Sequence, residues 1–340
     1  MISNHIIRGG LQMKKISIMF LVLIMILSFA SIQVSAAEDD QLSVAILLPG
    51  PISDQGWNMV AYNALKHVEE KLGVKTAYSE QVPASDYEEI FRGYASSGYD
   101  IIMGHGFEFG DAAKKVAKDF KDKNFIVTST NITQEPNVAS FRINDAQSGF
   151  VQGVIAALLT ETGKVGTLGG MEIPPIINQQ KGFKAGVEYI DEDIEVISSY
   201  TGSFHDVAKG KEMTKAMAEE GVDIIVADAD QTNLGVIEAA KEEDLLVLGS
   251  SGDLGKNNPE VVVTSLVEDF SVAFETVVKE VKQGNFKVKA YELGIADDVV
   301  SLAPYRKFED EISEENKEKI NEVVEKFRTR ELSVDEYLEY

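Results

Sequence analysis

The sequence contains no cysteine among its 340 residues. This absence excludes disulfide bonds, thiolate nucleophiles and cysteine-ligated metal centres, and it excludes a lipid-modified cysteine as a membrane anchor. Histidine is also scarce, and none of His5, His67, His105 and His205 stands at a metal-ligand spacing from another. We therefore predict neither a zinc site nor any other metal, and no cofactor.

Basic residues are outnumbered, with 32 Lys and Arg against 56 Asp and Glu, which gives a formal net charge of −24. Residues 1–36 carry three basic residues and no acid, so the rest of the chain has a charge of −27. Such a surface repels a phosphate backbone, and we expect no nucleic-acid partner. Solubility is the simplest interpretation of this charge.

One long uncharged run occurs in the chain, from Ile16 to Ala37 behind Lys14-Lys15. Its densest apolar part, Ile16–Leu27, has a length typical of the core of a signal peptide, about 7–15 residues. Val34-Ser-Ala36 supplies the small residues of a cleavage site, so we predict a signal peptide over residues 1–36 with Met13 as its true start. An uncleaved anchor is the alternative, because the whole run approaches the length that spans a bilayer.

Ten short segments rich in β-branched residues lie between Ser43 and Leu266, and they alternate with eight amphipathic helical segments between Gly56 and Lys282. This alternation predicts an α/β fold with mostly parallel sheets flanked by helices. The length and the similarity of Tyr99-Asp-Ile-Ile-Met103 to Val222-Asp-Ile-Ile-Val226 indicate two lobes. We expect lobe 1 to span 42–142 plus about 268–303, and lobe 2 to span 143–267.

The segment 305–340 differs from the rest because it is dense in Glu and Lys. It carries an apolar stripe at helical spacing, formed by Ile312, Ile320, Val323, Val324 and Phe327. We predict a charged C-terminal helix packed on the surface through this stripe, and a partner-binding helix is the alternative.

The first strand ends in a loop, Pro51-Ile-Ser-Asp-Gln-Gly-Trp-Asn58, that holds the only Trp of the chain. Ligands of open α/β sheets bind beyond the carboxyl ends of strands, in loops of this kind. Trp57 can stack on a flat heterocycle, and Asn58 can pair with its edge through a donor and an acceptor. Packing in the core is the alternative for Trp57, and capping of the next helix is the alternative for Asp54.

Five later loops offer further ligand-binding candidates at the ends of strands. Gly106 allows close approach of the backbone, and Phe107 could face Trp57 from the opposite wall. The other candidates are Glu172 for hydroxyl groups, Phe204 as a second aromatic wall, Asp230 as a polar contact, and Asp253 in Gly249-Ser-Ser-Gly-Asp253. Structural roles stay open for them: Phe204 could pack against its lobe, and Asp253 could be a turn residue.

No residue pattern supports catalysis, since no serine stands in a G-x-S-x-G motif. Hydrolysis by two carboxyl groups stays open, because sequence does not give their separation. The candidates for it are Asp54, Glu172, Asp228, Asp230 and Asp253. Asp228-Ala-Asp-Gln-Thr-Asn233 is rejected as a calcium loop because it lacks the required Gly and Glu.

Several motifs together resemble the basic membrane protein family, also called the PnrA-like family of ABC-transporter solute-binding proteins. The resemblance covers roughly Leu42–Ala303. Its markers are Pro51-Ile-Ser-Asp-Gln-Gly-Trp-Asn58, Gly104-His-Gly-Phe107, Gly169-Gly-Met-Glu-Ile-Pro174, Tyr200-Thr-Gly-Ser-Phe204, Lys209-Gly-Lys-Glu212 and Gly235-Val-Ile-Glu-Ala-Ala240. The resemblance implies a two-lobe periplasmic-binding-protein type I fold that closes on a purine base or purine nucleoside, with Trp57 in the aromatic position and Asp54 and Asn58 matched directly.

Two departures from the family pattern concern the sugar. Many members have Ser-x-x-Lys where this chain has Ser265-Leu-Val-Glu268, and Gly-Val-Asp-x-Asp where it has Gly249-Ser-Ser-Gly-Asp253. In nucleoside binders the missing Lys and first Asp are associated with the sugar, so their absence favours a free base such as adenine.

We therefore expect a non-enzymatic solute-binding protein of an ABC importer, exported to the periplasm or cell surface. Its partners would be a small purine ligand and a transporter permease, and it would touch the membrane only through the transporter or an uncleaved signal. The alternatives are a sugar-binding protein of the same fold, a membrane-anchored sensor or regulator, and an exported nucleoside hydrolase.

Overall fold

The computed structural model describes residues 41–54 and 56–338. The predicted signal peptide lies outside the described residues. Of the helices within them, none is long and apolar enough to cross a membrane. From Leu42 onward the chain forms a single compact unit.

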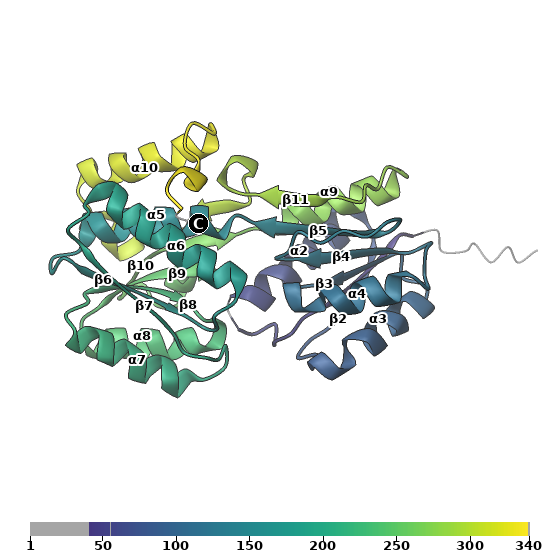
Figure 1. Ribbon diagram of the computed structural model, residues 1–340, viewed down its shortest axis with the longest axis horizontal. Coiled ribbons are helices and arrows are strands. Elements are labelled where there is room, and N and C mark those ends of the chain that lie inside the picture. Colours follow the sequence, from purple (N-terminus) through teal and green to yellow (C-terminus); the bar gives the residue numbers. More distant parts are fainter. Residues whose placement is uncertain (1–40, 55, 339–340) are drawn as a thin grey trace, which may run out of the picture. The chain divides into compact units, whose positions relative to one another are not determined.

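The first sheet is entirely parallel, with the strand order β11-β5-β4-β3-β1-β2. Its strands are β1 (Ser43–Leu47), β2 (Lys75–Ser79), β3 (Ile101–Gly104), β4 (Asn124–Thr128), β5 (Val138–Ile143) and β11 (Ala290–Leu293). Successive side chains of a strand point to opposite faces, and both faces are covered by helices. Helices α2 (Trp57–Leu72) and α9 (Ser271–Lys282) cover one face, and α3 (Tyr87–Ser96) and α4 (Gly110–Ala117) cover the other (Figure 1). Ile46 packs with α2 and α9, whereas Leu47 packs with α3 and α4.

The second sheet has the order β12-β10-β9-β8-β6-β7, and only the edge pair β10–β12 is antiparallel. Its strands are β6 (Lys164–Gly169), β7 (Glu195–Tyr200), β8 (Ile224–Asp228), β9 (Leu246–Ser251), β10 (Val262–Glu268) and β12 (Val300–Leu302). One face is covered by α7 (Val207–Glu219) and α8 (Asn233–Glu242), and the other by α5 (Asp145–Leu159) and α6 (Pro174–Ile190). The predicted α/β fold with two mostly parallel sheets is confirmed.

The chain passes between the two sheets three times: from β5 to β6, from β10 to β11, and from β11 to β12. After Glu268 the chain returns to the first sheet through α9 and β11. β12, however, pairs with β10 in the second sheet, although its residues fall in the range 268–303 that we assigned to lobe 1.

Helices α5 and α6 pack backbone to backbone through two glycines each. A Cβ atom on Gly149 would lie 1.9 Å from the carbonyl oxygen of Gln179, and one on Gly153 would lie 2.1 Å from that of Phe183. Gly182 and Gly186 meet α5 in the same way. This close packing holds the first turn of α5, which begins at Asp145, next to the carboxyl ends of the strands.

The charged segment at the end of the chain includes α10 (Glu314–Arg328). Ile320, Val323 and Phe327 on one side of this helix are buried and belong to the hydrophobic core, together with Ile312 just before it. Val324 is only partly buried. Phe327 packs edge-on against Phe150 of α5, with ring centroids 5.4 Å apart.

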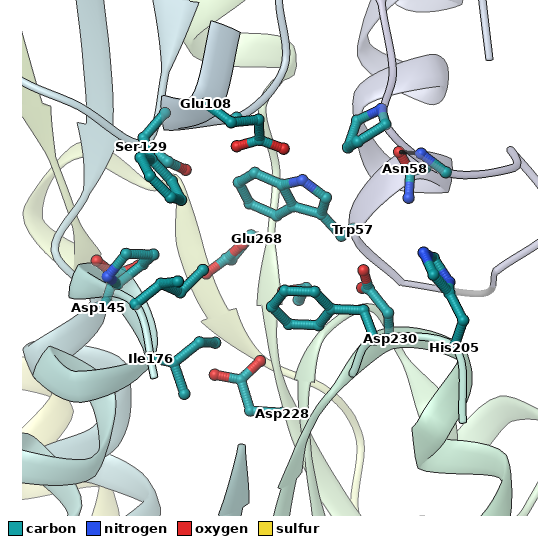
Figure 2. Close-up of a pocket in the computed structure, with 18 residues that line it drawn as sticks. Trp57, Asn58, Glu108, Ser129, Asp145, Ile176, His205, Asp228, Asp230 and Glu268 are labelled. Atoms are coloured by element: carbon teal, nitrogen blue, oxygen red, sulfur yellow. Dashed lines mark hydrogen bonds between the residues drawn. The ribbon is translucent and has the colours of Figure 1, made fainter. Parts of the chain in front are cut away.

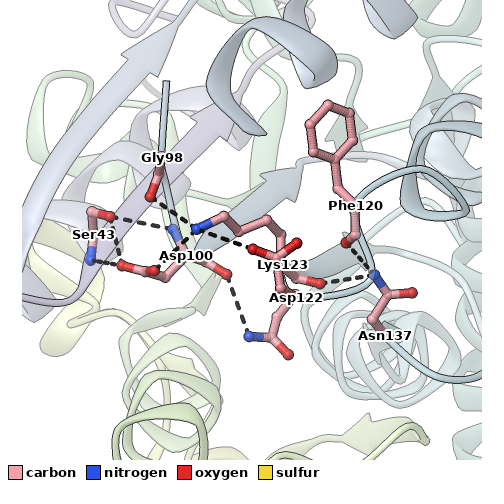
Figure 3. A network of polar contacts seen from close by, with 8 residues as sticks. Ser43, Gly98, Asp100, Phe120, Asp122, Lys123 and Asn137 are labelled. Atoms are coloured by element: carbon pink, nitrogen blue, oxygen red, sulfur yellow. Dashed lines mark hydrogen bonds and ion pairs between the residues drawn. The ribbon is translucent and has the colours of Figure 1, made fainter. Parts of the chain in front are cut away.

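The amino ends of the first sheet's strands are joined by a polar network (Figure 3). One carboxylate oxygen of Asp100 accepts from the backbone N–H of Ser43 at 2.9 Å and from its hydroxyl at 2.7 Å. Lys123 lies 3.5 Å from the other oxygen of the same carboxylate. The side-chain amide of Asn137 donates to the carbonyl oxygens of Phe120 and Lys123, each at 2.8 Å.

Candidate ligand-binding pocket

A cavity lies at the carboxyl ends of the strands and is bordered by loops from both sheets (Figure 2). Its volume is about 130 Å³, room for on the order of ten water molecules. The lining residues are Pro49, Gly50, Trp57, Asn58, Gly106, Phe107, Glu108, Ser129, Asp145, Ile173, Pro175, Ile176, Phe204, His205, Asp228, Asp230, Ser251 and Glu268. Ligands of open α/β sheets bind at this carboxyl end of the strands.

Trp57 borders this cavity from the first turn of α2. The imidazole of His105 stacks on the indole, with ring centroids 4.0 Å apart and planes inclined by 23°. Phe270 meets the indole edge-on at 5.4 Å. His105 therefore supports one face of the indole and Phe270 makes a second contact, while part of the indole stays accessible in the cavity.

His105 is a neutral structural support of Trp57. Burial of the imidazole lowers its pKa to about 3. The neutral ring then has one donor and one acceptor: Nε2 lies 3.0 Å from the carbonyl oxygen of Trp57 and Nδ1 lies 3.1 Å from the hydroxyl of Thr128. With Nε2–H donating to the carbonyl and the Thr128 hydroxyl donating to Nδ1, both ring nitrogens are satisfied.

Asp54 does not border the cavity, because its carboxylate caps α2. It accepts from the backbone N–H groups of Gly56, Asn58 and Met59 at 2.7–3.0 Å. It also accepts from the side-chain amide of Asn58 at 2.7 Å, while the amide oxygen of Asn58 accepts from Gly50 at 3.0 Å. Asp54 thus fixes the orientation of Asn58, which does line the cavity.

The predicted acids Glu172 and Asp253 are also absent from the cavity lining. Glu172 is exposed, although Ile173, Pro175 and Ile176 from the same loop border the cavity. Asp253 forms an ion pair with Arg306, a residue that follows β12. Of the nine predicted site residues, the structure brings Trp57, Asn58, Gly106, Phe107, Phe204 and Asp230 together around the cavity.

Glycine makes room for the second aromatic wall. A Cβ atom on Gly170 would lie 2.3 Å from the ring of Phe204, so only glycine lets the ring occupy this position. Phe107 is 37% exposed and also borders the cavity. Rings from three different loops therefore line the cavity.

Asp230 connects the two halves of the cavity. It follows β8 of the second sheet, and its Oδ1 atom would lie 3.8 Å from a Cβ atom on Gly56, the residue just before α2. Its backbone has φ 49°, a left-handed conformation that is uncommon for a residue other than glycine. The pKa of Asp230 is raised well above its usual value by burial first, and then by the nearby charges of Asp54 and Asp228.

Four further acids line the cavity that we did not predict as ligand-binding residues: Glu108, Asp145, Asp228 and Glu268. Of these, Asp228 was named only as a possible carboxyl group for hydrolysis. Burial raises the pKa of Asp145 to about 8, with the charge of Asp228 adding to the effect, and raises the pKa of Asp228 to about 6. Burial also raises the pKa of Glu268 well above its usual value and raises that of Glu108. Glu108 is exposed to solvent, but the walls of the cavity displace much of the water around its carboxyl group, and this desolvation raises its pKa.

These acids carried a sequence signal that we did not use. Asp145, Asp228 and Glu268 each stand at or just beyond the carboxyl end of a strand, β5, β8 and β10 respectively. The rule that drew attention to Trp57 applies equally to them. Residues 41–54 and 56–338 contain no group of three or more His, Asp or Glu side chains placed to hold a metal ion.

Comparison with known proteins gives the family. The model of the family described as ABC transporter substrate-binding protein PnrA-like (Bmp) matches residues 41–337. A purine-binding protein of Brucella abortus (strain 2308) is 27% identical over 281 residues, which are 82% of this chain and 79% of the relative. The nucleoside-binding protein BmpA of an ABC transporter in Lactococcus lactis subsp. cremoris (strain MG1363) is 30% identical over 256 residues, 69% of this chain and 73% of the relative.

Among solved structures, a solute-binding protein of an ABC transporter system from Aeropyrum pernix K1 superimposes with a TM-score of 0.77. The two chains are 23% identical, and the match covers 86% of this chain and 92% of that one. This likeness supports the fold, and the family match extends over nearly all of the residues that the structure describes. The chain belongs to the PnrA-like family of ABC transporter substrate-binding proteins.

Proposed function

We propose that this protein captures a purine base or purine nucleoside outside the cytoplasmic membrane and delivers it to the permease of an ABC importer. The observation that carries the proposal is the indole of Trp57 at the border of the cavity, stacked on a neutral His105. A flat heterocycle on the accessible part of the indole would gain about 1–3 kcal/mol from stacking. The names of the Brucella abortus and Lactococcus lactis relatives support a ligand of this class.

The remaining lining residues would give the pocket its specificity. Phe107 and Phe204 would complete the aromatic walls, and Gly106 would let the backbone approach the ring. Asn58, whose orientation is fixed by Asp54, would pair with the edge of the base. Asp230 would accept from a ring N–H or amino group when it is ionised.

Binding would be coupled to closure of the two sheet-containing lobes. The cavity takes residues from both sheets, and the three crossings between the sheets are the segments that can bend. A ligand that touches both lobes stabilises the closed form by its additional contacts there. The transporter would recognise this closed form. No chemical step is required, so the ligand would leave unchanged.

The proposal can be tested by the fluorescence of the single tryptophan. Because Trp57 is the only Trp in the chain, its emission reports on this site alone. We expect adenine, guanine, adenosine, guanosine or inosine to change the emission at saturable concentration, and ribose to leave it unchanged. Chromatography of the incubated mixture should return the ligand intact; cleavage of a nucleoside would instead indicate a hydrolase.

Substitution of the indole measures its contribution. Trp57→Ala should weaken purine binding by roughly 5- to 150-fold, the equivalent of about 1–3 kcal/mol, and Trp57→Phe should weaken it less. Titration calorimetry gives these affinities without the tryptophan signal. Tyr78→Ala is the control, since Tyr78 is 40% exposed and is not a lining residue. Equal purine affinity in Trp57→Ala and the unmodified protein would contradict the proposal.

A further inference from the structure

Three acids border the cavity at neighbouring chain segments: Asp145 at the start of α5, Asp228 at the end of β8, and Glu268 at the end of β10. In the view of Figure 2, Asp145 lies on the other side of the indole from Asn58, and Glu268 and Asp228 lie below the indole. Their charges act on one another, because Asp145 and Asp228 both raise the pKa of Glu268. We refer to Asp145, Asp228 and Glu268 as the acidic trio.

Glu268 has an unsatisfied oxygen. The residue is only 8% exposed, and its Oε2 atom has no hydrogen-bond partner among the described residues. The Ser251 side chain lowers the pKa of this carboxyl group, but Oε2 stays unpaired. A buried polar atom without a partner carries a desolvation cost that a bound ligand can remove.

No positive charge of the described lining compensates the acidic trio. The lining contains no lysine or arginine among the described residues, and His205 is exposed, with its ring near Gln231. Arg142 is the cation that acts on Asp145, but its guanidinium lies 2.7 Å from the carboxylate of Glu292 and is paired there. The first-turn position of Asp145 on α5 favours its charge, yet burial outweighs this effect.

Two things can relieve such a cluster: bound protons or a bound cation. Protonation neutralises the carboxyl groups but involves no bound ligand. A metal ion does not fit, since these side chains are not arranged to hold one. An ammonium group supplies three donors and a positive charge at once, so it satisfies Glu268 Oε2 and offsets the repulsion between the three acids.

We propose that the acidic trio binds a protonated amine carried by the ligand, so that the preferred ligand is a cationic purine derivative. The purine ring lies on Trp57 and the ammonium group lies against Glu268, Asp145 and Asp228. This inference rests on the proposed function for the ring and adds the charge of the ligand. The net charge of −24 favours the approach of such a cation.

Adenosine and its amino analogues test the inference. In 5′-amino-5′-deoxyadenosine and 3′-amino-3′-deoxyadenosine an ammonium group replaces one hydroxyl of nearly the same size. Titration calorimetry at neutral pH should show that at least one analogue binds at least about tenfold more tightly than adenosine. In Glu268→Gln this preference should fall below about threefold.

Controls separate charge from folding. Glu311→Gln makes the same change at an exposed residue outside the cavity lining and should keep the full preference. Glu268→Gln removes a buried acid, so the thermal midpoint of this variant should not fall. Asp145→Asn is a second variant, which should also lose the preference for the amino analogues over adenosine.

Each outcome of the titrations has a distinct meaning. If adenosine binds as tightly as both analogues, the inference is overturned and the proposed function stands. A preference that persists in both Glu268→Gln and Asp145→Asn also overturns it. If none of the purine bases and nucleosides binds, the proposed function fails and the inference fails with it.

Discussion

The two ends of the parallel strands treat the same kind of side chain in opposite ways. At the amino end of the first sheet, Asp100 accepts two hydrogen bonds from Ser43 and has Lys123 as a counter-charge. At the carboxyl end, Asp145 and Glu268 stand at the cavity without a lysine or arginine among the described lining residues. The pKa of Asp145 rises to about 8 through burial and the charge of Asp228.

The difference separates residues that hold the fold from residues that we propose to contact a ligand. Full pairing lowers the energy of the folded chain, whereas an unpaired buried acid raises it. Substitutions should therefore change stability in opposite directions at the two ends: removing polar groups should destabilise the amino end and should stabilise the cavity end of the unliganded protein.

The largest effect is expected at Asn137, which is 3% exposed. Its amide donates to the carbonyl oxygens of Phe120 and Lys123, and Asn137→Ala would leave these partly buried acceptors without that donor. We expect the free energy of unfolding to fall by about 3 kcal/mol. Urea denaturation measures it, and the slope with denaturant should stay unchanged.

Asn124→Ala is the control at the same edge of the sheet. Asn124 is half-buried, and its amide donates at 3.3 Å to the carbonyl oxygen of Asp100. Its removal should cost less than about 1 kcal/mol. If the free energy of unfolding fell equally in the two variants, the buried amide of Asn137 would contribute no more to stability than the half-buried amide of Asn124.

The opposite sign is expected at Asp145. An unfolded Asp has a pKa of about 4, and the folded value is about 8, so the folded state binds the extra proton between these pH values. The stability of the unliganded protein should therefore decrease as pH rises from about 4 to about 8. Asp145→Asn removes the penalty and should raise the free energy of unfolding at pH 8 by about 2 kcal/mol, less than the full shift because the carboxyl group adjoins an open cavity.

Denaturation at pH 5 and pH 8 measures this effect. Every acid of this negatively charged chain contributes some general repulsion at high pH, so Asp193→Asn, at an exposed position, is the reference. The gain from Asp145→Asn should exceed that of Asp193→Asn at pH 8 and should vanish toward pH 4. A constant gain across this range would show that the proton is not bound at Asp145.

The fold was largely predictable because its sheets are buried on both faces. Runs such as Val44–Leu47 are wholly buried, and β-branched runs between helices predict parallel strands. The two strands that we missed, β11 and β12, have four and three residues and lie at sheet edges. Their pairing depends on tertiary contacts with β5 and β10 rather than on a pattern of their own.

The cavity was predictable in its aromatic residues and less so in its acids. Trp57 and Phe204 stand in loops with glycine and polar residues, which mark the end of a strand. The carboxylate of Asp54 is instead used by the N–H groups at the start of α2, and that of Asp253 by Arg306, a partner 53 residues away in the sequence. Side-chain direction and long-range pairing decide these cases, and sequence spacing contains neither.

The smallest effect is expected at Lys123, and it tests whether charge or hydrogen bonding holds the amino end together. Its ammonium lies 3.5 Å from Asp100 and 3.2 Å from the carbonyl oxygen of Gly98. Because Asp100 already accepts from Ser43, Lys123→Met should lower the free energy of unfolding by only about 0.5–1 kcal/mol. Measured at 0.15 M and 1 M NaCl, the loss should shrink at the higher salt, since screening weakens the pair in the unmodified protein. A loss as large as that of Asn137→Ala would mean that Asp100 depends on its counter-charge, and the contrast with the uncompensated acids of the cavity would then rest on charge pairing rather than on hydrogen bonds.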